Sequence, residues 1–241
     1  MDDFSIFDDH ESPYPLPSGQ CWLLDVSRLA GSSSLPDMLT EKEMRRANAY
    51  KYQRDRDRCI VRTAWLRHRL ARLIGVRPSD LKFEGGPWGK PTLVGLENAP
   101  YFNLSHSDDL VLLGMSSDFS VGVDIESVPG FTDWRELYQT ILSPAEIAAF
   151  GDLRDQEKPF FLARGWTIKE AIVKLTGHGL NVGLSSIELD YSAESIAIRG
   201  LPKELYRTSC SLIHSWMPRD SFWAACVFGK SIRLGDPLPN L

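Results

Sequence analysis

Paired metal-binding residues and long apolar runs are scarce in this sequence. Its four cysteines lie far apart and form no Cys-x-x-Cys pair, and its five histidines form no His-x-x-x-His pair. This spacing excludes a zinc knuckle and a dense disulfide framework. No apolar run approaches the roughly 18 residues that cross a bilayer. A bound metal would therefore be a hard ion held by carboxylates.

An excess of positive charge and a secretion signal are also lacking. The 241 residues include 27 Lys+Arg against 32 Asp+Glu, a formal net charge of −5, so binding to nucleic acid through a basic field is excluded. The acidic start has neither the basic nor the apolar region of a signal peptide. We expect a cytoplasmic protein with no nucleic-acid or membrane partner. A polyanionic ligand would have to meet a local basic cluster.

Hydrophobic residues make up 43% of the chain and charged residues 24%, as in a folded globular protein. Their pattern predicts a strand, helices and strands, followed again by helices and strands, which indicates the α+β class. We predict an irregular, proline-containing arm over residues 1–19, an N-terminal half over 20–120 and a C-terminal half over 121–241. The two halves are comparable in their elements but share no readable sequence repeat.

Local signals predict where the elements begin and end. Helical spacing runs from residue 39 to Gly75, broken into two helices, and a long helix over 157–175 ends near Gly177. Ser143 and Pro144 indicate another helix start. A glycine- and proline-rich loop is predicted over residues 85–91, and strands are predicted over residues 20–26, 101–107, 110–115, 121–125, 186–191, 195–199, 209–214 and 222–228. The polar run between the third and fourth of these strands is typical of a hairpin.

Residues 121–126 (VGVDIE) place two carboxylates on one face of a strand. Side chains alternate along a strand, so Asp124 and Glu126 point to the same side as Gly122. Carboxylates this close repel each other, and a divalent cation would relieve the repulsion. A solvated strand face at the end of a hairpin is the alternative, because such alternation is common in half-exposed sheets.

Residues 166–174 (WTIKEAIVK) place Glu170 and Lys174 four residues apart, on one face of a helix. The simplest interpretation of this pair is an ion pair on a helix surface. Residues 103–107 (NLSHS) end a strand in hydrogen-bonding groups, among which His106 could donate to a phosphate. A single histidine is more often a structural residue. None of the three motifs decides the function alone.

In this order and spacing, the three motifs resemble those of the 4′-phosphopantetheinyl transferases. The basic helical stretch over residues 42–58 and the loop GKP at 89–91 are similar to the same family. The chain length resembles the monomeric, Sfp-type branch, whose fold is a pseudo-dimer of two α+β halves packed together in one chain. Cys59 departs from the pattern, since a hydroxyl residue often occupies that position, and the arm over 1–19 matches nothing in it.

The resemblance implies a Mg²⁺-dependent enzyme that moves the 4′-phosphopantetheine arm of coenzyme A onto a serine of an apo acyl or peptidyl carrier protein and releases 3′,5′-ADP. The implied metal ligands are Asp124, Glu126 and Glu170. Glu170 would also take the proton of the carrier serine, and Lys174 would stabilise the leaving phosphate. Phosphoryl transfer depends on positioning and on charge neutralisation, which suits these groups.

The resemblance also implies a site for coenzyme A as the substrate. Its basic and polar residues come from several predicted elements: Lys42, Arg46, Arg58, Lys90, Ser105, His106, Asp124, Lys169 and Lys174. Arg58, His106 and the basic helix would surround the 3′-phosphate, and Lys169 would reach a phosphate from the side of the long helix. A solvated helix face is the alternative interpretation of the basic helix.

Two other functions stay open at this point. A non-catalytic protein that binds coenzyme A or a nucleotide on the same scaffold would be expected to lose a metal carboxylate or Glu170, whereas all three acidic residues are present. An unrelated metal-dependent phosphohydrolase would cleave coenzyme A without a carrier. Because both halves belong to one chain, we expect a monomer.

Overall fold

The computed structural model describes residues 4–86, 90–177, 182–191, 196–205 and 208–231. The fold is α+β, as the sequence predicts. Its helices are α1 (Glu41–Asn48), α2 (Gln53–Ile74), α3 (Trp134–Ile141), α4 (Pro144–Gly151) and α5 (Lys158–Thr176). Its strands are β1 (Glu11–Leu16), β2 (Gly19–Asp25), β3 (Phe83–Gly85), β4 (Pro91–Leu93), β5 (Tyr101–Ser107), β6 (Leu110–Ser116), β7 (Ser120–Ser127), β8 (Glu188–Asp190), β9 (Ala197–Gly200), β10 (Thr208–Arg219) and β11 (Phe222–Ser231). Among the described helices, none has the length and apolar character to span a bilayer.

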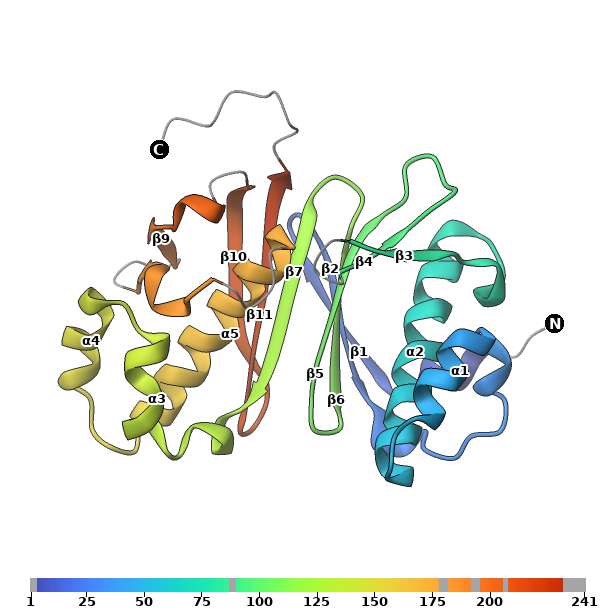
Figure 1. Cartoon of the computed structure of the whole chain (residues 1–241), viewed down its shortest axis with the longest axis horizontal. Helices are drawn as coiled ribbons and strands as arrows, with labels where there is room; N and C mark the ends of the chain where they lie inside the picture. Colours follow the sequence, from blue (N-terminus) through green and yellow to red (C-terminus); the bar gives the residue numbers. More distant parts are fainter. Residues whose placement is uncertain (1–3, 87–89, 178–181, 192–195, 206–207, 232–241) are drawn as a thin grey trace.

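Two antiparallel sheets stand face to face, with helices on their outer sides (Figure 1). The first sheet has the strand order β1-β2-β6-β5, and the second has the order β10-β11-β7. α1 and α2 flank the first sheet, while α3, α4 and α5 lie outside the second. The layers therefore run helix, sheet, sheet, helix, and the sheets meet in the middle of the molecule.

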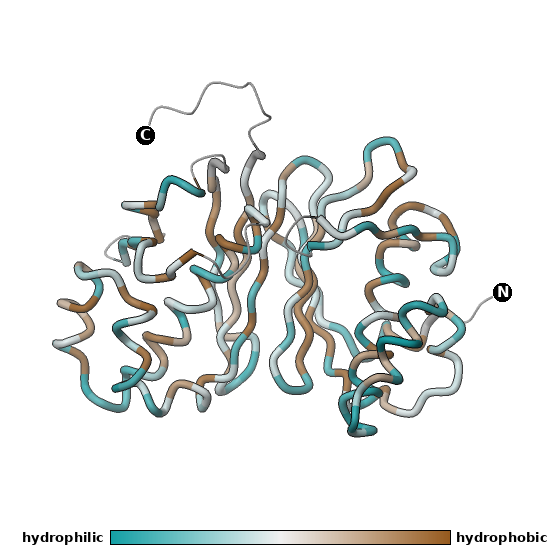
Figure 2. The backbone as a smooth tube through the Cα atoms, viewed as in Figure 1, coloured by the Kyte–Doolittle hydropathy of each residue, from teal (hydrophilic) through white to brown (hydrophobic). Residues whose placement is uncertain are grey.

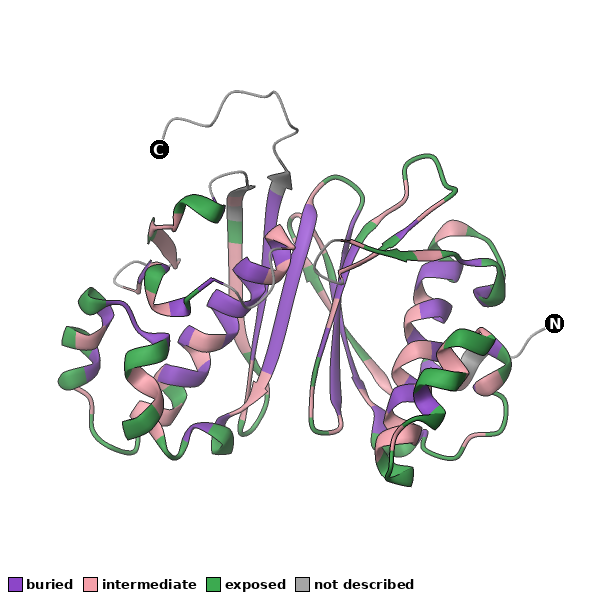
Figure 3. Cartoon of the chain, viewed as in Figure 1, coloured by how far each residue is buried: buried purple, intermediate pink, exposed green. Residues whose placement is uncertain are grey.

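The two sheets share a hydrophobic core. Apolar side chains from both inner faces form it: Cys21, Leu23, Leu110, Leu112, Val121, Val123, Ile125, Ala224, Cys226 and Phe228. Hydrophobic residues recur along the central strands (Figure 2), and most of the length of these strands is buried (Figure 3). The three apolar residues of β7 point into this core, so the predicted alternation of VGVDIE is confirmed and its carboxylates face the other side.

The predicted hairpin over residues 110–125 is wrong. β6 pairs with β2 and β5, whereas β7 pairs with β11, so the chain crosses from one sheet to the other between β6 and β7. The Ser116 hydroxyl closes this turn by accepting hydrogen bonds from the N–H groups of Asp118 and Phe119. Both strands are buried along most of their length. A strand that is covered on both faces carries no pattern that reveals its partner.

The predicted irregular arm over residues 1–19 contains a strand, β1, at the edge of the first sheet. Pro13 lies opposite Trp22, and Pro15 lies opposite Gln20. The two prolines are two residues apart, so the missing N–H groups fall on the same side of the strand, and an edge strand needs donors on only one side. Proline excludes a central strand here but not an edge strand, which is why the prediction failed.

The helices begin and end near the predicted positions. α2 and α5 end before Gly75 and Gly177, whose φ values of 80° and 74° lie in the left-handed region that glycine adopts without strain. α4 begins with a capping box, in which the side chains of Ser143 and Glu146 each bind the other residue's N–H. Of the predicted loop over 85–91, residues 87–89 lie outside the described residues.

Gly122 lets α5 lie directly against β7. A Cβ atom at this position would overlap the carbonyl oxygen of Ala171 and lie 2.5 Å from the backbone nitrogen of Leu175. Both obstacles belong to a helix backbone, which cannot rotate away as a flexible side chain does. We expect Gly122→Ala to lower the free energy of unfolding by at least the roughly 1–3 kcal/mol of an overpacked core, measured by urea denaturation. Gly130→Ala, whose Cβ would meet open space, is the control, and equal stability of the two variants would contradict the close approach.

Candidate functional site

The edges of the two sheets meet where β5 lies beside β7. Two N–H groups of β7 donate to side chains of β5 rather than to another strand. Asn103 Oδ1 accepts a hydrogen bond from the Val123 N–H (2.9 Å), and Ser107 Oγ accepts one from the Ser127 N–H (3.2 Å). Alternate residues of the NLSHS motif thus satisfy edge groups that would otherwise be unpaired.

The same junction brings hydroxyl groups to the carboxylates of β7. Ser105 donates to Asp124 Oδ1 (2.8 Å), and Ser107 donates to Glu126 Oε2 (3.0 Å). The ammonium group of Lys174, from α5, contacts both Ser105 Oγ (2.9 Å) and Asp124 Oδ1 (2.6 Å). Three elements distant in the chain, β5, β7 and α5, therefore converge on one polar site.

Asp124, Glu126 and Glu170 form an acidic cluster between β7 and α5. Asp124 is 1% exposed and Glu170 is 5% exposed. Burial, followed by the charge of Asp124, raises the pKa of Glu126 and of Glu170 to about 7. Burial also raises the pKa of Asp124, against the opposing charge of Lys174. Within the described residues, Asp124 Oδ2 and Glu170 Oε1 are buried without a hydrogen-bond partner.

The acidic cluster fits a hard cation by its chemistry. Three carboxylates, two of them with an unpartnered buried oxygen, are the type of donor set that Mg²⁺ and Ca²⁺ bind. A cation would also remove the repulsion that helps to raise their pKa values. In the described part of the chain, no three Asp, Glu, His or Cys side chains lie in an arrangement that could hold a metal ion, so binding at the acidic cluster would require its side chains to move. The counter-charge to Asp124 is supplied by Lys174 instead.

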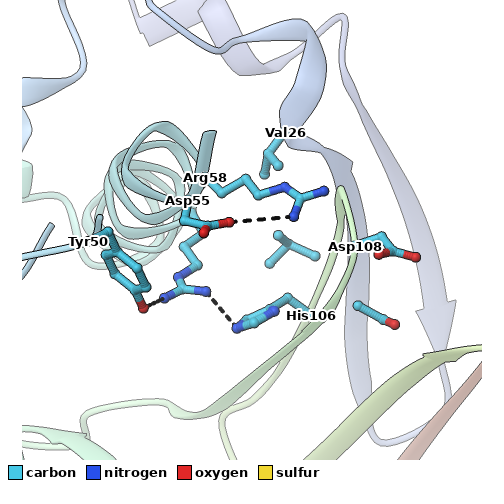
Figure 4. Close-up of a pocket in the computed structure, with 9 residues that line it drawn as sticks. Val26, Tyr50, Asp55, Arg58, His106 and Asp108 are labelled. Carbon is cyan, nitrogen blue, oxygen red and sulfur yellow. Dashed lines mark hydrogen bonds and ion pairs between the residues drawn. The ribbon is translucent and has the colours of Figure 1, made fainter. Parts of the chain in front are cut away.

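A cavity of about 240 Å³ lies between α2 and the end of β5 (Figure 4). Arg58 and Arg62 enter it from α2, and His106 enters it from β5. The carboxylate of Asp109 accepts a hydrogen bond from Arg58 Nε (2.7 Å), which raises the pKa of Arg58. Neighbouring side chains of a strand face opposite sides, so the cavity and the acidic cluster lie on two sides of the same strand end.

A wider groove of about 550 Å³ lies beside the cavity, against β7 and α5. Glu126 and Trp166 line it, and Phe131 packs edge-to-face on Trp166 with ring centroids 6.1 Å apart. Ser107 and Asp108 line both the cavity and the groove. The two hollows are therefore neighbours, and one carboxylate of the acidic cluster stands in the wall of the groove.

The prediction that Lys169 contacts a phosphate is wrong. Its side chain is fully buried, and its ammonium group donates to the Ile141 carbonyl oxygen (2.8 Å) and to the Glu146 carboxylate. Successive residues of a helix point about 100° apart, so Lys169 faces α4 while Glu170 faces β7. Lys169 therefore connects α5 by hydrogen bonds to the junction between α3 and α4.

Lys90 joins two elements near the other end of β7. Its ammonium group donates to the carbonyl oxygens of Val121 (2.9 Å) and Leu175 (3.2 Å), and burial lowers its pKa to about 8. These bonds connect the start of β7 with the end of α5. A contact between Lys90 and a nucleotide stays a prediction.

The other predicted coenzyme A residues fall into three places. Arg58 and His106 line the same cavity. Ser105 lies instead in the hydrogen-bond network of the acidic cluster. Lys42 and Arg46 are exposed on α1 and line neither of the two hollows described above. Of the predicted coenzyme A residues in this paragraph, the structure thus brings only Arg58 and His106 together in the cavity.

Comparison with known proteins connects these motifs to one family. Residues 31–118 match the family model described as 4′-phosphopantetheinyl transferase, N-terminal, and residues 120–227 match that of the 4′-phosphopantetheinyl transferase superfamily. The protein slr0495 of Synechocystis sp., assigned as a 4′-phosphopantetheinyl transferase, is 33% identical over 175 residues, which cover 71% of this chain and 70% of that protein. The chain belongs to the 4′-phosphopantetheinyl transferase family.

Two further relatives are also 33% identical to this chain over the residues that align. The 4′-phosphopantetheinyl transferase HetI of Nostoc sp. is 33% identical over 162 residues, which cover 65% of this chain and 68% of HetI. The 4′-phosphopantetheinyl transferase psf-1 of Bacillus pumilus is 33% identical over 165 residues, 65% of each chain. The two family models meet at the turn between β6 and β7, where the chain crosses from the first sheet to the second.

The sequence analysis gave no individual role to some polar residues of this site. Arg62 lies one helical turn after Arg58, so its spacing could have revealed it. Asn103 and Ser107 share the two-residue alternation of the NLSHS motif, which was also readable. Asp109 gave no signal, because the arginine that it binds lies 51 positions away in the chain.

Proposed function

We propose that this phosphopantetheinyl transferase moves the 4′-phosphopantetheine arm of coenzyme A onto the serine hydroxyl of an apo acyl or peptidyl carrier protein. The observation that carries the proposal is the acidic cluster with Lys174 beside it, next to a cavity that presents two arginines. In the reaction, the serine oxygen forms a bond to the phosphorus of the pantetheine phosphate. The bond from that phosphorus to the bridging oxygen breaks, and 3′,5′-ADP leaves.

Glu170 takes the proton of the carrier serine in this proposal. Burial and the charge of Asp124 raise its pKa to about 7 in the absence of a cation, and a carboxylate within reach of a hydroxyl group is a common general base. Its Oε1 atom has no hydrogen-bond partner within the described residues, so it is available either to a proton or to a cation, and the other oxygen would serve the second role. Lys174, one turn further along α5, stabilises the negative charge of the leaving phosphate. Both groups stand on one face of a rigid helix.

Asp124, Glu126 and Glu170 would hold Mg²⁺. The support is that Asp124 and Glu170 are buried and each has an oxygen without a hydrogen-bond partner within the described residues, with Glu126 beside them. Bound there, the ion would neutralise charge on the pyrophosphate oxygens. The hydroxyl of Ser105 keeps the Asp124 carboxylate in place for this role.

The nucleotide of coenzyme A would lie in the cavity, against Arg58 and His106. Lys42 and Arg46 would approach the same ligand from α1. Their place in the chain supports this approach, because they lie eight and four residues before Tyr50, and Tyr50 lines the cavity. A single chain would act as a monomer, because the cavity, the groove and the acidic cluster are all built within it.

Incubation with coenzyme A and Mg²⁺ is expected to add the mass of one phosphopantetheine group to an apo carrier protein. Intact-mass analysis of apo carriers of the fatty-acid, polyketide and non-ribosomal peptide types would measure the addition. EDTA should abolish it, because the acidic cluster then lacks its cation, and a carrier with its serine replaced by alanine should stay unmodified. No addition under any divalent metal would refute the proposal, and cleavage of coenzyme A without a carrier would favour a phosphohydrolase.

A further inference from the structure

We infer that Lys174 makes the binding of a divalent cation at the acidic cluster depend on a bound anion. Lys174 holds the negative charge of Asp124 until an anionic ligand takes up its ammonium group. The inference concerns the regulation of the acidic cluster, and it rests on the proposed function for the identity of the anion, the pyrophosphate of coenzyme A. The contacts of Lys174 at the junction of β5, β7 and α5 carry the argument.

Lys174 is the counter-ion of the most deeply buried carboxylate of the cluster. Its ammonium group lies 2.6 Å from Asp124 Oδ1 and 2.9 Å from Ser105 Oγ, and the Ser105 hydroxyl donates to the same Asp124 oxygen at 2.8 Å. The three groups form a closed triangle of hydrogen bonds. Any cation that Asp124 binds would therefore meet the positive charge of Lys174, and two positive charges at close range in a buried site repel each other strongly.

Of these two partners, Lys174 is the one that can change its position. The Asp124 side chain is 2% exposed, whereas the Lys174 side chain is 31% exposed. Asp124 is fixed by its strand, where it lies opposite Ala225 of β11. A lysine side chain is a flexible stem of four carbons, so its ammonium group can turn toward a ligand in solvent while its backbone stays in the helix.

The departure of Lys174 and the arrival of a cation depend on each other. Within the described residues, Lys174 is the only cationic side chain paired with Asp124, and a buried carboxylate that loses its counter-ion is strongly destabilised. A cation would supply the replacement charge, and buried oxygens without a hydrogen-bond partner on Asp124 and Glu170 are available to it. The ammonium group therefore leaves Asp124 most easily as the cation arrives.

An anion completes this exchange by receiving Lys174. A phosphate oxygen accepts a charge-assisted hydrogen bond from an ammonium group, so it replaces the carboxylate that Lys174 gives up. In the proposed reaction Lys174 binds the leaving phosphate, and the same contact frees Asp124 for the cation. Each ligand thus strengthens the binding of the other, and thermodynamic linkage requires the two effects to be equal. The acidic cluster then acquires its cation when the substrate is in place.

Lys174→Met is expected to tighten the binding of Mg²⁺ alone by about 5- to 150-fold, the usual range of coupling between two sites. Methionine carries no charge, so Asp124 keeps its full negative charge for the cation. Isothermal titration calorimetry with Mg²⁺, without nucleotide or carrier, measures the change. Lys203→Met removes the same charge from an exposed position outside the acidic cluster and should leave the affinity for Mg²⁺ unchanged. Lys174→Arg retains the charge and should bind Mg²⁺ no more tightly than the wild type.

A second titration uses the wild-type protein and does not depend on how well a variant folds. Saturating coenzyme A should tighten the binding of Mg²⁺ to the wild type, and it should do so by a smaller factor for Lys174→Met. The difference between the two factors is the part of the coupling that Lys174 supplies, apart from any direct contact between Mg²⁺ and the pyrophosphate. Equal affinity of the wild type for Mg²⁺ with and without coenzyme A would overturn the inference.

The possible outcomes separate this inference from the proposed function. A protein that modifies no carrier, but binds Mg²⁺ more tightly as Lys174→Met, would refute transfer and support the inference. A protein that transfers phosphopantetheine, but whose Lys174→Met variant binds Mg²⁺ no more tightly than the wild type, would support transfer and overturn the inference. No binding of Mg²⁺ by either protein, with or without coenzyme A, would also overturn it.

Discussion

Glu170→Gln is expected to lower the rate of phosphopantetheine transfer by about 10²- to 10⁴-fold at saturating coenzyme A and Mg²⁺, the usual contribution of a general base. Glutamine keeps the shape of the side chain and one oxygen, but it accepts no proton at physiological pH. The binding of coenzyme A should change little, because Glu170 does not line the cavity. Single-turnover transfer to an apo carrier and calorimetric titration of coenzyme A measure the two effects separately.

The matched control for this change is Glu97→Gln, since Glu97 is an exposed carboxylate outside the site. It should retain the wild-type rate. A titration with Mg²⁺ then separates the two roles proposed for Glu170. Full recovery of Glu170→Gln at high Mg²⁺ would remove the role of base and leave that of metal ligand. Unchanged activity at every Mg²⁺ concentration would remove both roles and the proposed location of the reaction.

Lys169→Met is expected to lower the free energy of unfolding by about 3–5 kcal/mol, the range for breaking a buried ion pair on one side. Lys169 and Glu146 have side chains that are 0% and 1% exposed, so methionine would leave the Glu146 carboxylate charged, buried and without its cation. Methionine keeps most of the length of the side chain, which limits the contribution of a cavity. Urea denaturation measures the loss when the slope of unfolding free energy against urea concentration is the same for both proteins.

A double variant tests the cause of this loss. Glu146→Gln combined with Lys169→Met removes both charges, and the single amide oxygen of glutamine keeps one of the two hydrogen bonds, from the Ser143 N–H or from the Leu189 N–H, that the two oxygens of Glu146 accept. We expect the double variant to be more stable than Lys169→Met alone. The alternative result is a loss of stability, relative to wild type, equal to the sum of the losses of Glu146→Gln and Lys169→Met. In that case the two residues act independently, and the buried ion pair does not account for the effect.

Much of the acidic cluster was predictable because it depends on local stereochemistry. Alternation along a strand places Asp124 and Glu126 on one face of β7, opposite three apolar residues that the core confirms. Helical periodicity places Glu170 and Lys174 on one face of α5. The interval between these residues along one element is enough to decide which of them share a face.

The partners of the strands were not predictable in the same way. β7 pairs with β11, about a hundred residues further along the chain, rather than with its neighbour β6. A strand that is buried on both faces has the same apolar pattern whichever sheet receives it. The prolines of β1 likewise exclude a central position but leave an edge position open.

The sequence by itself determined the α+β class, the ends of the long helices and the shared faces of the motif residues, because each depends on neighbours within a few positions. Only the tertiary structure decided which motif residues reach the site. Lys169 and Lys174 belong to one motif, yet Lys169 is buried against Glu146, 23 positions away, while Lys174 reaches Asp124, 50 positions away. Arg62 meets His106 across 44 positions of chain. A side chain's charge partner, and with it the role left to that side chain, depends on contacts between elements that no local pattern encodes.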